Sequence, residues 1–300
     1  IKPFQALPFV LDGGPARLGF GSRELAMMCA SHSAEPMHLA AVSGMLERAG
    51  ASPDRLQCDC HVPLRFAATG ASPAPGERFT EIENNCSGKH AGFLAWCALH
   101  GEPMERYLDF DHPLQRAIRE RLAQVCEVPQ GAMRSGIDGC SAPNHAIPLR
   151  SLALGYARLG QGASGDGEFA APLGELSGAM LAHPELVSGT GRHDLALMRA
   201  APGDWIAKGG ADGVQAIAVR SAGLGIAVKI IDGNARAAVS AAIGVLDALG
   251  LVGDAQREAL APFARPEIRN ARGLLVGEAR SVVALRLAPR PEFAPVPLPR

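Results

Sequence analysis

The feature that most constrains the fold is a change of hydrophobic period near residue 205. Before this point, apolar residues recur mainly at the spacing of helix faces. After it come three short, β-branched runs separated by turns, at residues 205–208, 213–220 and 223–231. Such runs predict an antiparallel meander. Asn234 follows the last run and is a suitable N-cap for an alanine-rich helix that extends to about residue 249.

Seven segments upstream of the meander have helical periodicity, at residues 2–11, 22–29, 37–49, 87–99, 113–125, 149–160 and 171–182. Ser22 is placed to cap the second of them, and Gly50 follows the third, as glycine does at helix C-termini. With a strand expected at residues 281–287, the pattern predicts an α/β or α+β protein, with an antiparallel sheet flanked by helices and a helical subdomain. We expect one domain over residues 1–290 and a loose, proline-rich tail over residues 291–300.

Composition excludes several classes of function. The net charge of −1 gives no reason to expect a nucleic acid or an anionic membrane as partner. No apolar run approaches the roughly 20 residues of a transmembrane helix. The seven cysteines are odd in number and scattered, which is typical of a reducing compartment and of free or metal-bound thiols. We therefore expect a cytoplasmic protein and, because the chain opens with Ile1 and not methionine, a missing upstream segment.

Residues 84–93, Asn-Asn-Cys-Ser-Gly-Lys-His-Ala-Gly-Phe, hold a dense group of reactive side chains. They supply a thiol, a hydroxyl, an amine and an imidazole at the start of a predicted helix, where free N–H groups and the helix dipole favour anions and thiolates. Cys86 and Lys89 are three positions apart and can share one face. One interpretation makes Cys86 a nucleophile that works with His90. Another makes the segment a capped helix start, with Asn85 or Ser87 as the cap and Cys86 as an inert, buried thiol.

A second dense motif lies at residues 135–145, where glycines and a proline predict a loop. Its Asp138-Gly139-Cys140 segment supplies a carboxylate and another thiol. Cys86 and Cys140 would then offer two thiolates from separate glycine-rich segments. With Lys89 as an unusual third ligand, if its amine is deprotonated, they form a candidate Zn²⁺ site with one open position.

Two lysines, Lys2 and Lys208, lie in sequence positions that suit proton transfer. A serine three residues before Lys2 would form Ser-x-x-Lys, in which a neutral lysine accepts the serine proton. Ser31-His32-Ser33 is a polar turn after a predicted helix, and Lys208-Gly209-Gly210 ends a predicted strand. These positions are comparable to the Ser-x-Asn and Lys-Thr-Gly elements of penicillin-binding proteins. A lysine acts as a base near neutral pH only when burial or neighbouring cations lower its pKa.

Together these residues resemble the Rhizobium etli-type L-asparaginase II family, the serine-β-lactamase-like asparaginases, over nearly the whole chain to about residue 249. The match rests on residues 2–5, 30–33, 85–92, 136–140, 189–192 and 208–209. The resemblance implies a fold like that of serine β-lactamases and penicillin-binding proteins. It also implies hydrolysis of the small-molecule substrate L-asparagine to L-aspartate and ammonia, usually by a homodimer.

The resemblance further implies roles for individual residues. Two Ser–Lys pairs would carry out catalysis: Ser31 with Lys208, and Lys2 with a serine that would precede Ile1. The residues implied to surround them are Cys86, Lys89 and Cys140 as Zn²⁺ ligands, and His90, Asp138, Ser87 and Gly139 as contacts of substrate or metal-bound water.

The chain departs from the family pattern at its beginning, since the serine paired with Lys2 and the N-terminal strands expected before it are absent from the sequence. Either the sequence is a piece of an active enzyme, which we favour, or the nucleophile is Ser31. Two other functions stay open. One is a zinc-containing, non-catalytic ligand-binding relative, and the other is a glutaminase or β-lactam-recognising serine hydrolase.

Overall fold

A three-stranded antiparallel sheet lies where the change of period predicts a meander. The computed structural model describes residues 1–286. The sheet consists of β3 (Trp205–Gly210), β4 (Val214–Val219) and β5 (Leu224–Lys229), paired in that order. The register runs without a shift across both pairs. Because β4 lies in the centre, β3 is an edge strand, and its outer backbone groups need partners from elsewhere in the chain.

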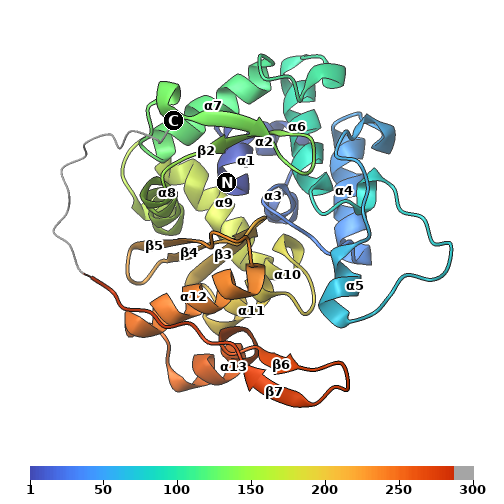
Figure 1. Cartoon of the computed structure of the whole chain (residues 1–300). Coiled ribbons are helices and arrows are strands. Elements are labelled where there is room, and N and C mark those ends of the chain that lie inside the picture. Colours follow the sequence, from blue (N-terminus) through green and yellow to red (C-terminus); the bar gives the residue numbers. More distant parts are fainter. Residues whose placement is uncertain (287–300) are drawn as a thin grey trace.

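Helices cover both faces of this sheet (Figure 1). α8 (Leu149–Gln161) and α12 (Ala235–Ala248) both pack against β4 and β5, and Figure 1 shows them on opposite sides. α11 (His193–Ala200) packs against the edge strand β3. A Cβ built on Gly225 would lie 1.8 Å from the carbonyl oxygen of Ala153, so only glycine allows β5 to approach α8 this closely.

Most predicted helices are present with small shifts at their ends. The other helices are α1 (Lys2–Leu11), α2 (Gly14–Leu18), α3 (Ser22–Met28), α4 (Pro36–Arg48), α5 (Leu64–Thr69), α6 (Ser87–His100), α7 (Pro113–Val125), α9 (Ala170–Ala182), α10 (Pro184–Val187) and α13 (Asp254–Ala264). Asn234 caps α12 as predicted, since its side chain accepts the N–H of Ala237. The predicted cap Ser22 is instead the first residue of α3, after Gly21.

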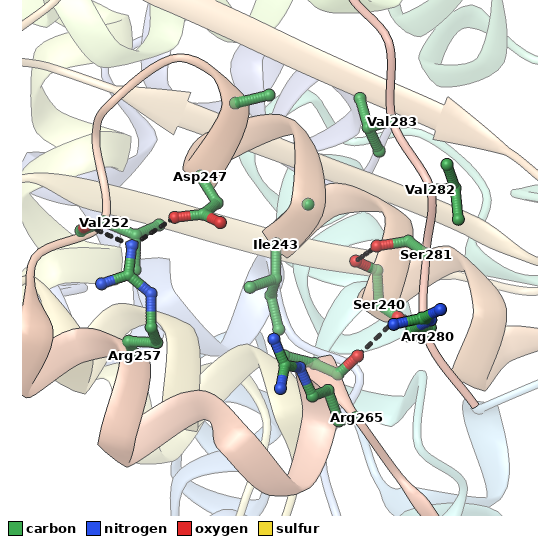
Figure 2. A pocket seen from close by; sticks show the side chains of 13 residues that line it. Ser240, Ile243, Asp247, Val252, Arg257, Arg265, Arg280, Ser281, Val282 and Val283 are labelled. Carbon is green, nitrogen blue, oxygen red and sulfur yellow. Dashed lines mark hydrogen bonds and ion pairs between the residues drawn. The ribbon is translucent and has the colours of Figure 1, made fainter. Parts of the chain in front are cut away.

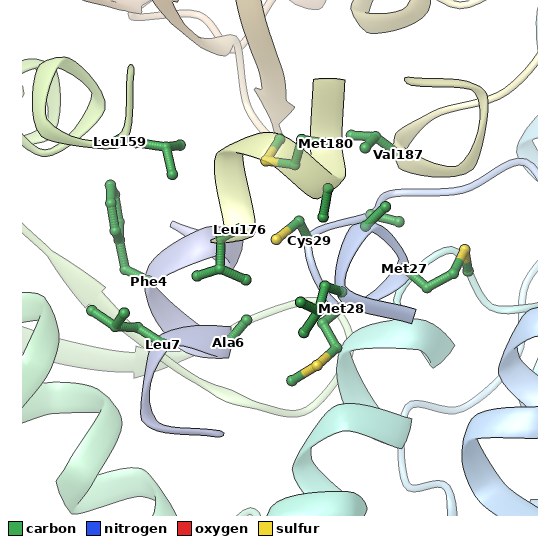
Figure 3. Packing of buried hydrophobic residues seen from close by; sticks show 14 of the residues in the cluster. Phe4, Ala6, Leu7, Met27, Met28, Cys29, Leu159, Leu176, Met180 and Val187 are labelled. Carbon is green, nitrogen blue, oxygen red and sulfur yellow. The ribbon is translucent and has the colours of Figure 1, made fainter. Parts of the chain in front are cut away.

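The helix α1 passes through the middle of the molecule, and its residues 3–10 are all buried. Figure 3 shows its Phe4 and Leu7 beside side chains from the end of α3 and from α9, including Cys29 and Leu176. α1 also packs against α6 and α7. This core fixes the first turn of α1, and with it the position of Lys2.

The segment 135–145 was predicted to be a loop, and this prediction is wrong. It contains most of a hairpin, β1 (Arg134–Ile137) and β2 (Pro143–Ala146), paired antiparallel with Gly136 opposite Asn144. Each strand has only four residues, too few for an alternating pattern to stand out from the glycines between them. The turn of this hairpin carries Asp138 and Cys140.

The predicted strand at residues 281–287 is also wrong in the part that the structure describes, because residues 281–286 have no strand assignment. Two short strands lie before it instead, β6 (Glu267–Arg269) and β7 (Leu275–Glu278). The predicted tail, residues 291–300, lies outside the described residues. Among residues 1–286, no helix combines the length and apolar character needed to cross a membrane.

Candidate active site

Ser31 and Lys2 meet in space although they are far apart in sequence. The Lys2 amine lies 2.9 Å from the Ser31 hydroxyl and also donates to the carbonyl of Ala30. Ser31 lies between α3 and α4, in a segment held on its backbone. Its N–H donates to Val187 O at 2.9 Å, and its own carbonyl accepts a hydrogen bond from Arg192 at 3.0 Å. The contact therefore places a potential nucleophile against a potential base on a fixed support.

Lys208 comes from the edge strand β3 and is 4% exposed. Its amine donates to the carbonyl of Gly209 and lies 3.8 Å from Asp194 Oδ2. Burial lowers the pKa of Lys208 to about 8, with Asp194 opposing this change and the cations Lys2 and Arg192 adding to it. A buried amine with such a pKa can accept a proton near neutral pH.

The chain uses lysine sparingly, and its lysines gather in one region. It contains twenty-five arginines but only four lysines. Three of the four lie at or near the candidate site, namely Lys2, Lys208 and the buried Lys89. The fourth, Lys229, is exposed on β5. Arginine stays protonated in proteins, so it cannot replace an amine that must lose a proton. The scarcity of lysine beside so many arginines is therefore a signal, visible in the sequence itself, that the remaining lysines have functional amines.

The first turn of α6 brings the second group of reactive side chains into the interior. Ser87, Lys89 and His90 are buried there, and Cys86 occupies the N-cap position. The Asn84 side chain fixes this start, because its carbonyl accepts the Cys86 N–H at 2.8 Å while its amide donates to Cys58 O. The sequence predicted a helix start here, with Asn85 or Ser87 as the cap; the N-cap residue is Cys86.

The turn of the β1–β2 hairpin meets this end of α6. The Lys89 amine lies 2.8 Å from Cys140 Sγ and 3.0 Å from Asp138 Oδ2. Asp138 Oδ1 accepts the backbone N–H groups of Cys140 and Ala142, each at 3.0 Å, and so shapes the turn. Cys86 is also hydrogen-bonded to Cys140. The predicted metal ligands Cys86, Lys89 and Cys140 are therefore together, with Asp138 beside them.

Charges in this cluster balance one another. The hydrogen bond from Cys140 holds the pKa of Cys86 well below its ordinary value, and this same bond raises the pKa of Cys140. Burial opposes the charge on Lys89, but Cys86, Cys140 and Asp138 together raise its pKa. Burial likewise opposes the charge on Asp138, whose pKa Lys89 and Cys140 nevertheless lower to about 2. In the protein alone, the Lys89 ammonium thus contacts the Asp138 carboxylate and the Cys140 thiol and acts electrostatically on the Cys86 thiolate.

His90 presents an unpaired polar atom inside the same region. Its Nδ1 lies 2.7 Å from the Tyr107 hydroxyl, which also accepts the N–H of Gln57. We assign the Tyr107 O–H as the donor to Nδ1. Nε2 then carries the ring proton. Burial, with Lys89 adding to it, lowers the pKa of His90 well below its ordinary value, so the ring is neutral. Among residues 1–286 its buried Nε2 has no hydrogen-bond partner, although it faces the backbone of Cys140.

His32 connects the two groups, a role that the sequence analysis missed. Its Nε2 lies 2.8 Å from Ser87 Oγ, and the Ser87 hydroxyl donates to Ile82 O. Its Nδ1 accepts the N–H of Ala34, so Nε2 is the donor to Ser87. The hydroxyl of Ser87 is therefore fully engaged with protein groups. The predicted contacts of substrate with Ser87 and with the exposed Gly139 stay predictions.

The predicted pair of Ser31 and Lys208 is not in direct contact, and Lys2, which was expected to pair with a serine before Ile1, contacts Ser31 instead. Lys2 lies within electrostatic reach of both Lys208 and Cys86, and so links the Ser–Lys group to the thiol group. Among the described residues, the direct lysine partner of Ser31 is Lys2. Lys208 contacts Gly209 and Asp194, and no hydrogen bond joins it to Ser31 in this part of the chain.

Two surface cavities in the described part of the chain lie elsewhere and hold different chemistry. One of about 350 Å³ lies between α12, α13 and residues 280–283 (Figure 2). Its wall includes the Arg257–Asp247 ion pair, with 2.5 Å between nitrogen and oxygen, and apolar side chains such as Ile243. Another of about 730 Å³ lies beside α8 and includes Gly162 and Phe169. Neither contains the serine, lysine and thiol groups described above, so the chemistry assigns the candidate active site to the Ser31–Lys2–Lys208 and Cys86–Cys140 region.

Comparison with known families identifies the family of the chain. The family model described as L-asparaginase II matches residues 1–281, which is nearly the whole chain and includes every residue of the candidate site. No match is found among curated proteins. Because the family match spans far more than half of the sequence, the chain belongs to the L-asparaginase II family of amidohydrolases.

Proposed function

We propose that this protein hydrolyses L-asparagine to L-aspartate and ammonia through Ser31, assisted by Lys2 and Lys208. The observation that carries the proposal is the 2.9 Å contact between Lys2 Nζ and Ser31 Oγ, which leads us to prefer Ser31 to the upstream nucleophile that the sequence analysis favoured. Membership of the L-asparaginase II family supports the reaction class. The buried Lys208, with its pKa lowered to about 8, supports a second amine that changes protonation near neutral pH.

In the first step, Ser31 Oγ forms a bond to the side-chain amide carbon of asparagine while the serine proton passes to a neutral lysine amine. The oxyanion that forms collapses, the C–N bond breaks, and the lysine ammonium returns the proton to the departing nitrogen, which leaves as ammonia. The product of this step is an ester between Ser31 and the aspartyl group. Water then attacks the ester, the amine accepts a proton from the water, and the serine oxygen recovers a proton as aspartate leaves.

The lysines suit this role better than arginines would, because only an amine can alternate between base and acid near neutral pH. Lys2 contacts the hydroxyl directly, and Lys208 is the buried amine that lies within electrostatic reach of Lys2. We propose that proton transfer at Ser31 runs through Lys2, and that Lys208 sets the charge around it. His90 offers its unpaired Nε2–H as a donor to the substrate.

The arrangement of elements supports a serine-β-lactamase-like fold of the Rhizobium etli type. An antiparallel sheet has helices on both faces, and a lysine lies on its edge strand β3. The serine-bearing segment lies between the helices α3 and α4. We also propose one domain over residues 1–290, a homodimer and a cytoplasmic location, on the resemblance and on the free, scattered cysteines.

A Zn²⁺ ion held by Cys86, Lys89 and Cys140 is part of the proposal. Two buried thiols converge on one amine, and sulfur and nitrogen donors suit zinc. Within residues 1–286, no three His, Cys, Asp or Glu side chains are arranged to hold a metal, so this site depends on the Lys89 amine as a donor. When bound, the ion would supply positive charge beside the substrate.

The test is ammonia release from L-asparagine by the full-length protein. Ser31→Ala and Lys2→Ala should each lower kcat by about 100-fold or more, because each removes a participant in the proton transfer. Lys229→Ala is the matched control, since it removes the one exposed lysine and should leave kcat unchanged. Undiminished turnover in Ser31→Ala would contradict the proposed nucleophile. Binding of asparagine without turnover by the unmodified protein would indicate a non-catalytic relative.

A further inference from the structure

Asp194 is a fully buried carboxylate that the proposed reaction does not yet use. It is the second residue of α11, and its side chain is 1% exposed. The backbone N–H of Gly209 donates to both of its oxygens, at 2.9 and 2.8 Å. The Gln215 amide donates to Oδ1 at 3.1 Å, and Lys208 Nζ lies 3.8 Å from Oδ2. The carboxylate therefore sits between the edge strand β3 and its lysine.

A structural role explains only part of this arrangement. β3 is an edge strand, so the outward N–H of Gly209 needs an acceptor, and a buried N–H without one is costly. A neutral asparagine could accept that hydrogen bond without burying a charge. Burying an unpaired carboxylate is expensive. In the described part of the chain, Lys208 is the lysine or arginine that forms an ion pair with Asp194. His193 beside it and the more distant Arg192 also favour the negative charge.

The start of α11 lies close against the backbone of β3. A Cβ on Gly209 would lie only 2.6 Å from His193 Nε2, and 3.4 Å from Asp194 Oδ2. Glycine at this position therefore makes room for His193, the residue before Asp194, while the carboxylate itself lies within contact distance of β3. His193 Nε2 itself is 3.4 Å from Oδ1.

We infer that Asp194 is a positioning residue for the proposed amidohydrolase reaction, in which its carboxylate anchors the Lys208 amine and acts as its buried counter-ion. This inference rests on the proposed function of Lys208. Asp194 acts through the lysine, without touching the substrate. Any reaction that needs Lys208 in a defined place and protonation state would depend on it.

The charged groups around Lys208 and Asp194 predict how removal of the Asp194 charge changes the pKa of Lys208. The groups that act electrostatically on Lys208 or Asp194 from the elements around them are Ile1 (the amino group), Lys2, Cys29, Cys86, Tyr156, Arg192 and His193. Burial, Lys2 and Arg192 lower the pKa of Lys208, while Asp194 raises it. Without the negative charge of Asp194, burial and the two cations lower the pKa of Lys208 with less opposition, so this pKa should fall further.

The first test is Asp194→Asn, which keeps an acceptor for Gly209 but removes the charge. The acidic limb of kcat/KM against pH should move to lower pH by about one unit or more, since two charges about 4 Å apart interact strongly inside a protein. The plateau of kcat should fall about tenfold or more as Lys208 loses its anchor, with KM little changed. Asp204→Asn is the control, because Asp204 also accepts a backbone N–H, from Ser221, but is far more exposed to solvent and does not pair with Lys208. An unmoved acidic limb would overturn the inference.

A second measurement does not depend on activity. In protein labelled with ¹³C at the lysine Cε atoms, the 300-residue chain contributes only four lysine signals, which single Lys→Arg variants assign. Asp194→Asn should shift the titration of the Lys208 signal to lower pH and leave the exposed Lys229 signal in place. This shift is expected even if asparagine is not the substrate, so failure of the proposed function and failure of this inference are distinguishable. A Lys208 titration equal in both proteins would refute the inference.

A double-mutant comparison covers the case in which Asp194→Asn does not fold. Lys208→Met leaves the buried carboxylate without its cation and should lower the Tm. Adding Asp194→Asn to Lys208→Met should raise the Tm again, because the orphaned charge is gone. Equal effects of Asp194→Asn in the presence and absence of Lys208 would show that the two residues are independent, which contradicts the inference.

Discussion

His32 Nε2 lies 2.8 Å from Ser87 Oγ, so the segment that carries Ser31 is tied to the first turn of α6. That turn also begins at Cys86 and carries Lys89. Both partners are completely buried. The proposed nucleophile and the proposed metal site are therefore parts of one rigid unit, and a change in this hydrogen bond should affect both.

The first prediction concerns His32→Ala. The substitution removes the donor to the Ser87 oxygen and the acceptor of the Ala34 N–H and leaves a cavity, which should lower the free energy of unfolding by about 2–4 kcal/mol. It should also reduce kcat, because the segment that carries Ser31 loses its connection to α6. Urea unfolding and ammonia release measure the two effects. The control is His100→Ala, which removes a half-exposed imidazole on α6 and should change either quantity little. Full activity and stability in His32→Ala would contradict the proposed connection.

The second prediction concerns the packing of α6 on α3. A Cβ on Gly88 would lie 2.4 Å from the carbonyl oxygen of Met27, which is a backbone atom and cannot move alone. Gly88→Ala should therefore push the two helices apart and lower the Tm by several degrees. Gly178→Ala in α9 is the matched control, since its Cβ would meet nothing within 4 Å. That control should stabilise the helix by about 0.5–1 kcal/mol. Equal Tm changes in the two variants would show that α3 and α6 are not in tight contact.

The sequence predicted the parts of the fold whose patterns are local. The β-branched runs identified β3, β4 and β5, and the Asn234 cap located the start of α12. The β1–β2 hairpin was missed because its strands are short and rich in turn residues. α13 was missed because its apolar positions are few and Pro262 interrupts them. In each case packing against the rest of the chain stabilises the element, and the local sequence pattern carries no information about that packing.

For the candidate site, the reactive residues could be identified from the sequence but their pairing could not. The predicted partner of Ser31 was Lys208, whereas the direct contact in the structure is with Lys2 on α1. Asp194 carries no motif and lies inside a short helix, so only its burial beside Lys208 draws attention to it. Pairings of this kind depend on how distant segments pack, since the two residues are often tens of positions apart.

The third prediction concerns metal content. The purified protein should contain zinc in stoichiometric amount, measured by mass spectrometry of the metal after dialysis. Lys89→Arg keeps a positive charge but cannot offer a neutral amine, so it should lose the zinc. Cys58→Ser is the control, because Cys58 is also buried but bonds to the backbone of Glu81. Zinc retained in Lys89→Arg would show that Lys89 is not a ligand.

The last prediction concerns pH. Because the pKa of Lys208 is lowered to about 8, its amine is mostly protonated below that pH and mostly neutral above it. If the neutral amine is required, kcat/KM should rise about tenfold per pH unit below pH 8 and level off above it. The same group affects stability in a defined direction. Its pKa in the folded protein lies below the ordinary lysine value of 10.5, so between about pH 8 and 10.5 the unfolded chain binds more protons.

The free energy of unfolding should therefore increase as the pH rises from about 8 to 10.5. Below pH 8 the buried Lys208 is charged in both states, and its burial is most costly there. Urea unfolding at a series of pH values measures this effect. Lys208→Met removes the titrating amine, so both the acidic limb of kcat/KM and this rise in stability should disappear. Lys229→Ala, which removes an exposed lysine, should retain both. A limb and a stability rise that persist in Lys208→Met would assign them to another group and contradict the role of Lys208.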